Sequence, residues 1–171
     1  MSSADKNLSS IDLSSIGDCS EFTIGIVTSE WNDGITKKLT KGAIKTLKAC
    51  KVKAKNIIQI QVPGSFELPL GAKMLYQEKS PDAILCIGCV IKGETKHNEY
   101  INNSVAKALT SLSLVSGIPF IFGVLTPDTK QQALDRCGGK HGNKGDEAAY
   151  TALKMIALKQ EIKSTKTKIG F

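Results

Sequence analysis

Residues 86–100 read CIGCVIKGETKHNEY, an apolar run that stops abruptly in a glycine, a polar cluster and a histidine. The run is uninterrupted over residues 83–91 and lacks the alternation of polar and apolar residues that marks a strand with one solvated face. A strand that is apolar on both faces is typical of a parallel sheet covered by helices on both sides. The stretch therefore predicts an α/β fold with a polar loop where this strand ends.

Three further strands and five helices are predicted around this stretch. The strands are expected at 22–27, 56–62, 82–91 and 119–125, and the helices at about 35–50, 66–77, 101–117, 127–137 and 146–160. Proline is tolerated in the first turn of a helix, which explains Pro69, and Thr126 before Pro127 is read as the cap of the fourth helix. Strands that alternate with helices predict a three-layer αβα sandwich with a four-stranded parallel, flavodoxin-like sheet.

Ligands of such sheets bind beyond the carboxyl ends of the strands. This rule selects four loops before any motif is considered, at residues 28–32, 62–67, 90–97 and 122–128.

A length of 171 residues suits one domain. Residues 1–21 are rich in serine and acidic and are read as a mobile N-terminal arm, residues 22–160 as the domain, and residues 161–171 as a frayed basic tail.

Composition excludes several classes of protein. Five cysteines without regular spacing indicate free thiols and a cytoplasmic location. The longest apolar run is far shorter than the roughly 20 residues of a membrane helix. The net charge of +7 comes largely from lysines on one side of the first helix, and only 5% of residues are aromatic, so no nucleic-acid partner is expected.

The loop that follows the central strand has two possible roles. Gly93-Glu94-Thr95 stands just before a helix, where free N–H groups bind phosphate, although a simple helix cap fits equally well. His97 has a side chain suited to proton transfer near neutrality, or else is structural.

The other loops also carry polar or aromatic candidates. Trp31 could stack on a planar ring or pack in the core. Ser65 and Glu67 could bind sugar-like hydroxyls, although Glu67 also suits the helix dipole. Arg136 is either a helix C-terminal cation or a phosphate ligand, with Lys140 and Lys144 nearby.

Cys86 and Cys89 stand three residues apart within a strand, which sends their side chains to opposite faces. They therefore cannot bind a metal together, and no metal site is predicted.

Five blocks in order resemble the 6,7-dimethyl-8-ribityllumazine synthase family: Trp31-Asn32, PGSFELP (63–69), GCVIKGETKHNEY (88–100), PFIFGVLT (119–126) and QALDRCGGKHGNKGDEAA (132–149). The resemblance implies that 22–160 is a lumazine synthase domain. Members condense 5-amino-6-(D-ribitylamino)uracil with 3,4-dihydroxy-2-butanone 4-phosphate, releasing phosphate and water, in the penultimate step of riboflavin biosynthesis. They need no metal or organic cofactor.

The resemblance also implies roles for individual residues. The pyrimidine and its ribityl chain would contact Trp31, Ser65, Phe66, Glu67, Cys89, Val90, Ile91 and Phe122. Phosphate would be bound by Glu94, Thr95 and Arg136, with Lys144 as a supporting cation and His97 as the proton shuttle. Phe122 and Arg136 would reach the site from the adjacent subunit.

Family members form pentamers, and many pack twelve pentamers into a shell. The short link GGKHGNKG favours the shell of 60 subunits, and riboflavin synthase would be the pathway partner. Two alternatives share the fold: a non-catalytic flavin-binding shell protein and a paralogous riboflavin synthase. The phosphate loop and Arg136 argue against both, because neither needs to hold a phosphorylated substrate.

Overall fold

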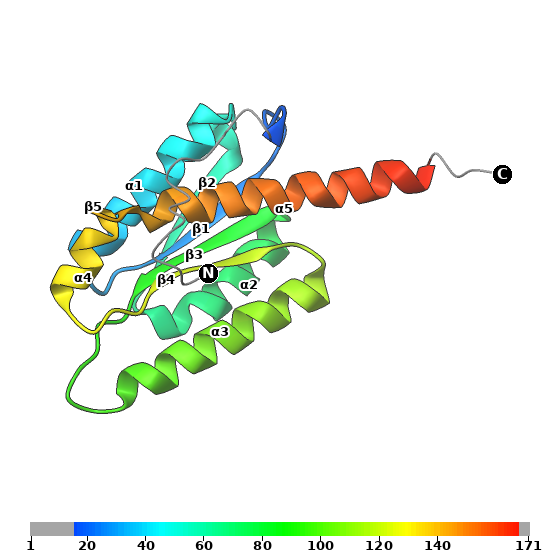
Figure 1. The fold of residues 1–171 in the computed structure, drawn as a ribbon. Coiled ribbons are helices and arrows are strands. Elements are labelled where there is room, and N and C mark those ends of the chain that lie inside the picture. Colours follow the sequence, from blue (N-terminus) through cyan, green and yellow to red (C-terminus); the bar gives the residue numbers. More distant parts are fainter. Residues whose placement is uncertain (1–15, 168–171) are drawn as a thin grey trace.

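The computed structural model describes residues 16–167, which form four long strands, two short ones and a set of covering helices (Figure 1). In chain order the elements are β1 (Ile24–Ser29), α1 (Asp33–Ala49), η2 (Ala54–Asn56), β2 (Ile57–Val62), η3 (Ser65–Glu67), α2 (Leu68–Lys79), β3 (Ala83–Cys89), α3 (His97–Ser116), β4 (Phe120–Leu125), α4 (Lys130–Asp135), β5 (Cys137–Gly139), β6 (Gly142–Asn143) and α5 (Lys144–Thr167). The four long strands lie within two residues of their expected bounds.

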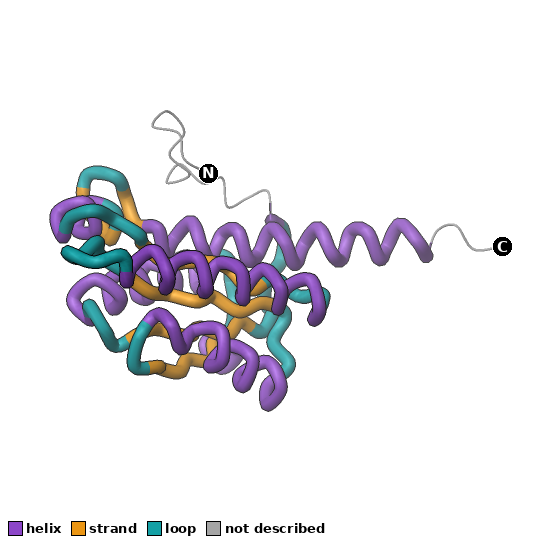
Figure 2. The backbone as a smooth tube through the Cα atoms, turned by 90° about the horizontal axis from the view of Figure 1, so that it is seen from below, coloured by secondary structure: helices purple, strands orange, loops and turns teal. Residues whose placement is uncertain are grey.

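The main sheet is parallel, with strand order β2-β1-β3-β4. Helices α1 and α5 pack on one face, and α2 and α3 pack on the other (Figure 1). Figure 2 shows the strands enclosed by helices. The predicted three-layer sandwich is therefore confirmed. All four strands end at the same edge of the sheet.

Strand β3 is central, and all seven of its residues are buried. Leu85, Ile87 and Cys89 lie in the core under α1 and α5. Ile84 and Cys86 lie in the core under α2 and α3. This two-sided burial explains the unbroken apolar run, and it confirms that Cys86 and Cys89 face opposite ways.

The region before α5 differs from the expectation. The cap of α4 is Thr129, whose Oγ1 accepts a hydrogen bond from the Gln132 N–H at 3.2 Å. Thr126 does not cap the helix, because the next residue, Pro127, instead accepts a bond from the Lys92 N–H at 3.0 Å and so continues the sheet edge. The glycine-rich link forms the antiparallel pair β5–β6.

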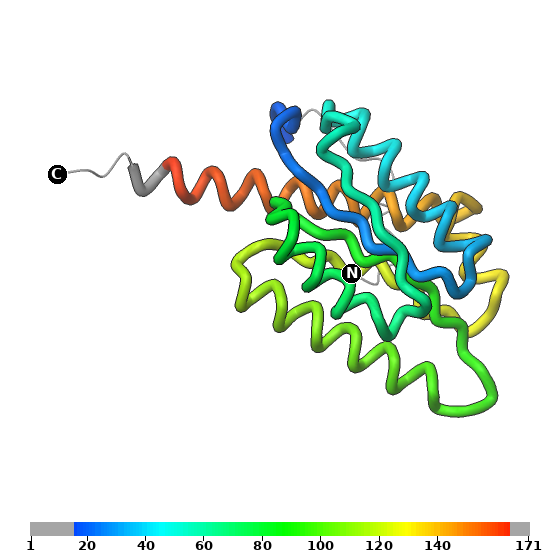
Figure 3. The backbone as a smooth tube through the Cα atoms, turned by 180° about the vertical axis from the view of Figure 1, so that it is seen from behind, coloured from blue at the N-terminus to red at the C-terminus, as the bar shows by residue number. Residues whose placement is uncertain are grey.

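The two ends of the domain also extend further than predicted. Ile16 and Cys19 are buried in the α1/α5 core, so this end of the expected arm is held against the domain, although Gly17, Asp18 and Glu21 are exposed. The rest of the predicted arm, residues 1–15, lies outside the described residues. Helix α5 continues past residue 160 to Thr167 and extends beyond the sheet (Figure 3). Among residues 16–167, no helix has the length and apolar composition needed to cross a membrane.

Candidate functional site

Hydrogen bonds join the four loops at the carboxyl ends of the strands. The Glu30 N–H binds the Val62 carbonyl at 2.8 Å, and the Asn32 side chain binds the Cys89 carbonyl at 2.9 Å. On the other side of β3, the Val90 N–H binds the Leu125 carbonyl at 2.8 Å. The loops selected by the topology rule therefore form one connected surface.

Trp31 lies on this surface directly after β1. The residue is 73% exposed, and its main-chain N–H donates to the Pro63 carbonyl at 3.1 Å. Within the chain it is therefore not a packing residue of the core, and a face of the indole is available for a planar ring. The next residue, Asn32, has φ 61° and ψ 41°, a left-handed conformation that asparagine tolerates better than most residues.

The turn after β2 brings η3 against the central strand. Phe66 is 59% exposed and Glu67 is exposed, whereas Ser65 is buried. A Cβ atom at Gly88 would lie only 2.6 Å from the Ser65 Oγ, so the glycine in β3 is what lets η3 approach so closely. The Ser65 Oγ is itself buried and has no hydrogen-bond partner among the described residues.

Residues 89–91 contribute main-chain groups rather than side chains. The Cys89 thiol is buried in the core, and burial raises its pKa to about 11, with a smaller effect from Cys137. Val90 and Lys92 both direct their N–H groups towards the β4 side. Because successive residues of an extended chain alternate, Ile91 directs its N–H and carbonyl towards the β1 side, where Asn32 lies. Among residues 16–167, the Ile91 N–H has no hydrogen-bond partner.

The loop of residues 93–96 is exposed and leads into α3, which has 20 residues. The Thr95 Oγ1 accepts a long hydrogen bond from the His97 N–H at 3.4 Å. The Glu99 and Tyr100 N–H groups both bind the Lys96 carbonyl, so within the described part of the chain Asn98 is the residue of the first turn whose N–H stays free. This N–H and the helix dipole favour an anion at this position. His97 is the first residue of α3, and side chains of a helix lean towards its N-terminus, so the imidazole lies near the loop.

Three of the predicted residues do not join this surface within one chain. Phe122 is paired with Cys86 inside β4, about 10 Å before the strand end. Arg136 ends α4, where its Nη1 donates to the Gln132 carbonyl at 3.1 Å. Lys144 binds the Glu147 carboxylate at 2.8 and 2.9 Å. Helix α4 lies on the α1/α5 side of the sheet and α3 on the other, which separates Arg136 from the loop of residues 93–96 (Figure 1).

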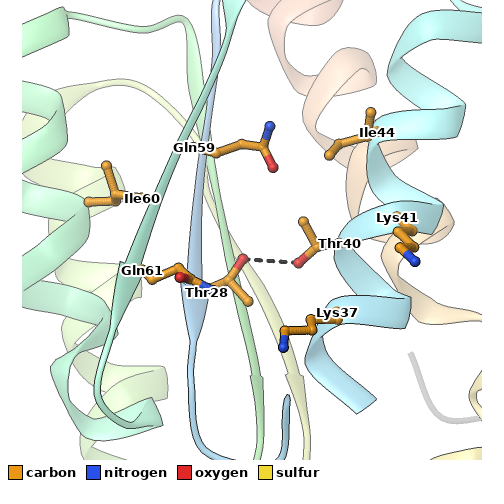
Figure 4. A pocket seen from close by; sticks show the side chains of 8 residues that line it. All are labelled: Thr28, Lys37, Thr40, Lys41, Ile44, Gln59, Ile60 and Gln61. Atoms are coloured by element: carbon orange, nitrogen blue, oxygen red, sulfur yellow. Dashed lines mark hydrogen bonds between the residues drawn. The ribbon is translucent and has the colours of Figure 1, made fainter. Parts of the chain in front are cut away.

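A groove elsewhere on the chain contains none of the predicted site residues. It lies between α1 and the edge strand β2, and Thr28 and Thr40 are joined across it at 2.9 Å (Figure 4). Its lining consists of Thr28, Lys37, Thr40, Lys41, Ile44, Gln59, Ile60 and Gln61. Within residues 16–167, no group of three or more His, Cys, Asp or Glu side chains is arranged to hold a metal ion.

Comparison with known proteins decides the family. The model of the family described as 6,7-dimethyl-8-ribityllumazine synthase matches residues 21–160. The 6,7-dimethyl-8-ribityllumazine synthase of Parabacteroides distasonis is 53% identical over 156 residues, which cover 91% of this chain and 98% of the relative. That of Cytophaga hutchinsonii is 54% identical over 157 residues, covering 92% and 98%. That of Flavobacterium psychrophilum is 49% identical over 161 residues, covering 94% and 85%.

The chain belongs to the 6,7-dimethyl-8-ribityllumazine synthase family. The resemblance stated from five sequence blocks is thereby confirmed. Asn32 lies in the selected loop of residues 28–32 and in the first block that resembles the lumazine synthase family, but no role was predicted for it. Its position directly after a strand and before a helix was a usable signal, because asparagine is common both at helix caps and in the left-handed conformation. The partner of its side chain, 57 residues away, carried no signal in the sequence.

Proposed function

We propose that the protein is a 6,7-dimethyl-8-ribityllumazine synthase, which condenses 5-amino-6-(D-ribitylamino)uracil with 3,4-dihydroxy-2-butanone 4-phosphate. The observation that carries the proposal is the composition of the strand-end surface. It combines an exposed indole, a free main-chain N–H and a helix N-terminus. These features suit a planar heterocycle and a phosphate, which are the two groups that the reaction must hold together.

The pyrimidine ring would stack on Trp31 and hydrogen-bond to Ile91. A uracil edge presents both donors and acceptors, and the Ile91 N–H and carbonyl offer the complementary pair. The ribityl chain would extend towards Ser65, Phe66 and Glu67 in η3, where the exposed Glu67 carboxylate can accept bonds from hydroxyls. Cys89 and Val90 would contribute main-chain groups to the same part of the site.

The phosphate would bind at residues 93–95 through the N–H groups of Glu94 and Thr95 and the N-terminus of α3. The substrate amine attacks the ketone carbon, and loss of water forms the imine. Phosphate is then eliminated, the resulting enol becomes a ketone, and the ribitylamino nitrogen attacks that carbonyl carbon and closes the second ring with loss of a second water. His97 would take a proton from the amine and return it to the departing oxygen; its position at the start of the same helix supports this role. This chemistry needs no nucleophile from the protein.

The site would be completed by a neighbouring subunit. Phe122 and Arg136 lie away from their own chain's strand-end surface, and both are suited to serving the next one. Helices α2 and α3 expose large apolar side chains, which favours contacts between copies: Leu70, Met74, Leu114 and Val115. We infer that the protein forms a pentamer and that twelve pentamers form a shell. Lys144 would be a supporting cation for the bound phosphate. A riboflavin synthase would consume the product, and the five free thiols favour the cytoplasm.

Incubation with both substrates tests the proposal. Lumazine fluorescence and equimolar phosphate release are expected, and omission of either substrate should abolish both signals. Absence of product would overturn the proposal. Riboflavin binding without product would favour a flavin-binding shell protein, and conversion of added lumazine into riboflavin would favour a riboflavin synthase. Native mass spectrometry of the same sample measures the number of subunits.

A further inference from the structure

Asn32 makes two kinds of contact that a simple helix cap would not combine. Its main-chain carbonyl accepts bonds from the Ile35 and Thr36 N–H groups at 2.8 and 3.1 Å, which begins α1. Its side chain takes no part in this cap. Instead the Nδ2 atom donates to the Cys89 carbonyl at 2.9 Å, at the end of the central strand. The side chain is therefore directed towards the strand-end surface rather than towards its own helix.

The left-handed backbone of Asn32 makes this contact possible. Among the described residues, Lys51 and Ser80 are the other non-glycine residues with positive φ, at 68° and 44°. Both follow the end of a helix, where such a conformation ends the helix. Asn32 instead stands between a strand and a helix and turns its amide across to β3.

This contact determines which main-chain groups of residues 89–91 remain available. Cys89 directs its carbonyl towards the β1 side, as Ile91 does its N–H and carbonyl, because alternate residues of an extended chain share a direction. The Asn32 amide occupies the Cys89 carbonyl. The main-chain N–H and carbonyl of Ile91 are thus the groups that remain free on that side.

Asn32 also links Trp31 to residues 89–91. The main-chain N–H of Trp31 binds the Pro63 carbonyl, and the side chain of Asn32 binds the Cys89 carbonyl. Two successive residues therefore join the loops after β1, β2 and β3. The position of the indole relative to Ile91 depends on both bonds.

We propose that Asn32 is a positioning residue that sets the register of the heterocyclic substrate. By occupying the Cys89 carbonyl, its amide leaves the uracil edge one place to bind, at Ile91, directly beside the Trp31 ring. The inference rests on the proposed function, since it concerns how the same substrate is oriented.

Asn32→Gly separates this role from the backbone conformation. Glycine adopts positive φ without strain and keeps the main-chain cap, so only the side-chain bond is lost. We expect the KM for the ribitylaminouracil to rise about tenfold, the equivalent of ~1.4 kcal/mol, while the KM for the butanone phosphate is unchanged. Because Trp31 is the single tryptophan, titrating its emission with the ribitylaminouracil measures the Kd directly, and this Kd should rise to the same extent.

A second variant and a control complete the test. Asn32→Asp has the same size but places a carboxylate oxygen against the Cys89 carbonyl, so we expect a larger rise in the same KM. Lys51→Gly introduces glycine at the left-handed position that follows α1, away from the carboxyl ends of the strands. This variant should leave both KM values unchanged.

Unchanged KM and Kd for the ribitylaminouracil in a folded Asn32→Gly or Asn32→Asp protein would overturn the inference. An equal rise in both KM values would do the same, because it would indicate a general loss of structure. Product formation by the wild-type protein is measured alongside, so failure of this inference is distinguishable from failure of the proposed function.

Discussion

Replacing Gly88 with alanine should displace the turn that carries Ser65. The added Cβ atom would lie 2.6 Å from the Ser65 Oγ and 3.0 Å from the Leu68 Cδ1. The first distance is too short for any Cβ contact, so η3 must move or the Ser65 side chain must rotate. Both Ser65 and Leu68 are buried, which limits how easily either can move.

The expected cost follows from two opposing effects. Overpacking a buried site by one methyl group costs about 1–3 kcal/mol, and the less flexible unfolded chain of alanine returns about 0.4–1 kcal/mol. Gly88→Ala should therefore reduce the free energy of unfolding by about 1–2 kcal/mol. Ser65→Ala alone should be neutral or stabilising, because it removes a buried hydroxyl that has no partner.

Combining the two substitutions gives the sharpest result. In Gly88→Ala/Ser65→Ala the contact at 2.6 Å is absent, and the nearest Ser65 atom would be the Cβ at 3.3 Å. The double variant should recover about 1 kcal/mol relative to the sum of the single changes, as expected for residues in contact. The KM for the ribitylaminouracil should rise in Gly88→Ala and return towards the wild-type value in the double variant.

Urea unfolding followed by circular dichroism at one protein concentration measures these energies. Gly71→Ala is the matched control, because its Cβ would lie equally close, 2.6 Å, to the Val62 Cγ1. Ser65→Ala does not remove that contact, so it should not recover the stability lost in Gly71→Ala. Gly88→Ala and Ser65→Ala energies that add to within about 0.5 kcal/mol would contradict a direct contact between residues 65 and 88.

Three further outcomes are expected. Arg136→Ala should raise the KM for the butanone phosphate about tenfold to a hundredfold through loss of a charge-assisted bond, and an unchanged KM would exclude that role. His97→Ala should lower kcat by about 10²- to 10⁴-fold in steady-state assays, whereas wild-type kcat would make His97 structural. Burial raises the pKa of Asp146, so the folded state binds this proton more tightly than the unfolded state does. The wild type should therefore lose stability as pH rises from the ordinary aspartate pKa to the raised one. Asp146→Asn should lack that loss when Tm is compared at pH 4 and pH 7, and an identical pH dependence would contradict the assignment.

Local patterns predicted the framework because they follow from short-range geometry. The unbroken apolar run of β3 reflects burial on both faces, and the helix positions follow from apolar spacing. Once the strands are known to be parallel, their carboxyl ends must meet at one edge, so the loops carrying Trp31, Ser65 and His97 could be selected in advance.

The errors lie where two local signals compete. Thr126 and Thr129 both stand before a possible helix, and the sheet-edge bond from Lys92 to Pro127 decides in favour of Thr129. Residues 16–21 look like the rest of a polar arm, because two buried side chains, Ile16 and Cys19, are too few for a periodic pattern. The β5–β6 pair is too short to be read from its glycines.

By itself the sequence determined the three-layer fold, the family and the edge of the sheet at which chemistry can occur. Only the tertiary structure decided which groups at that edge remain free. Asn32 occupies the Cys89 carbonyl and leaves Ile91 unpaired, and Gly88 admits Ser65 beneath β3. Residues far apart in the chain meet in each case, and the contact depends on hydrogen-bond direction and close packing, which a linear pattern of residue types does not encode.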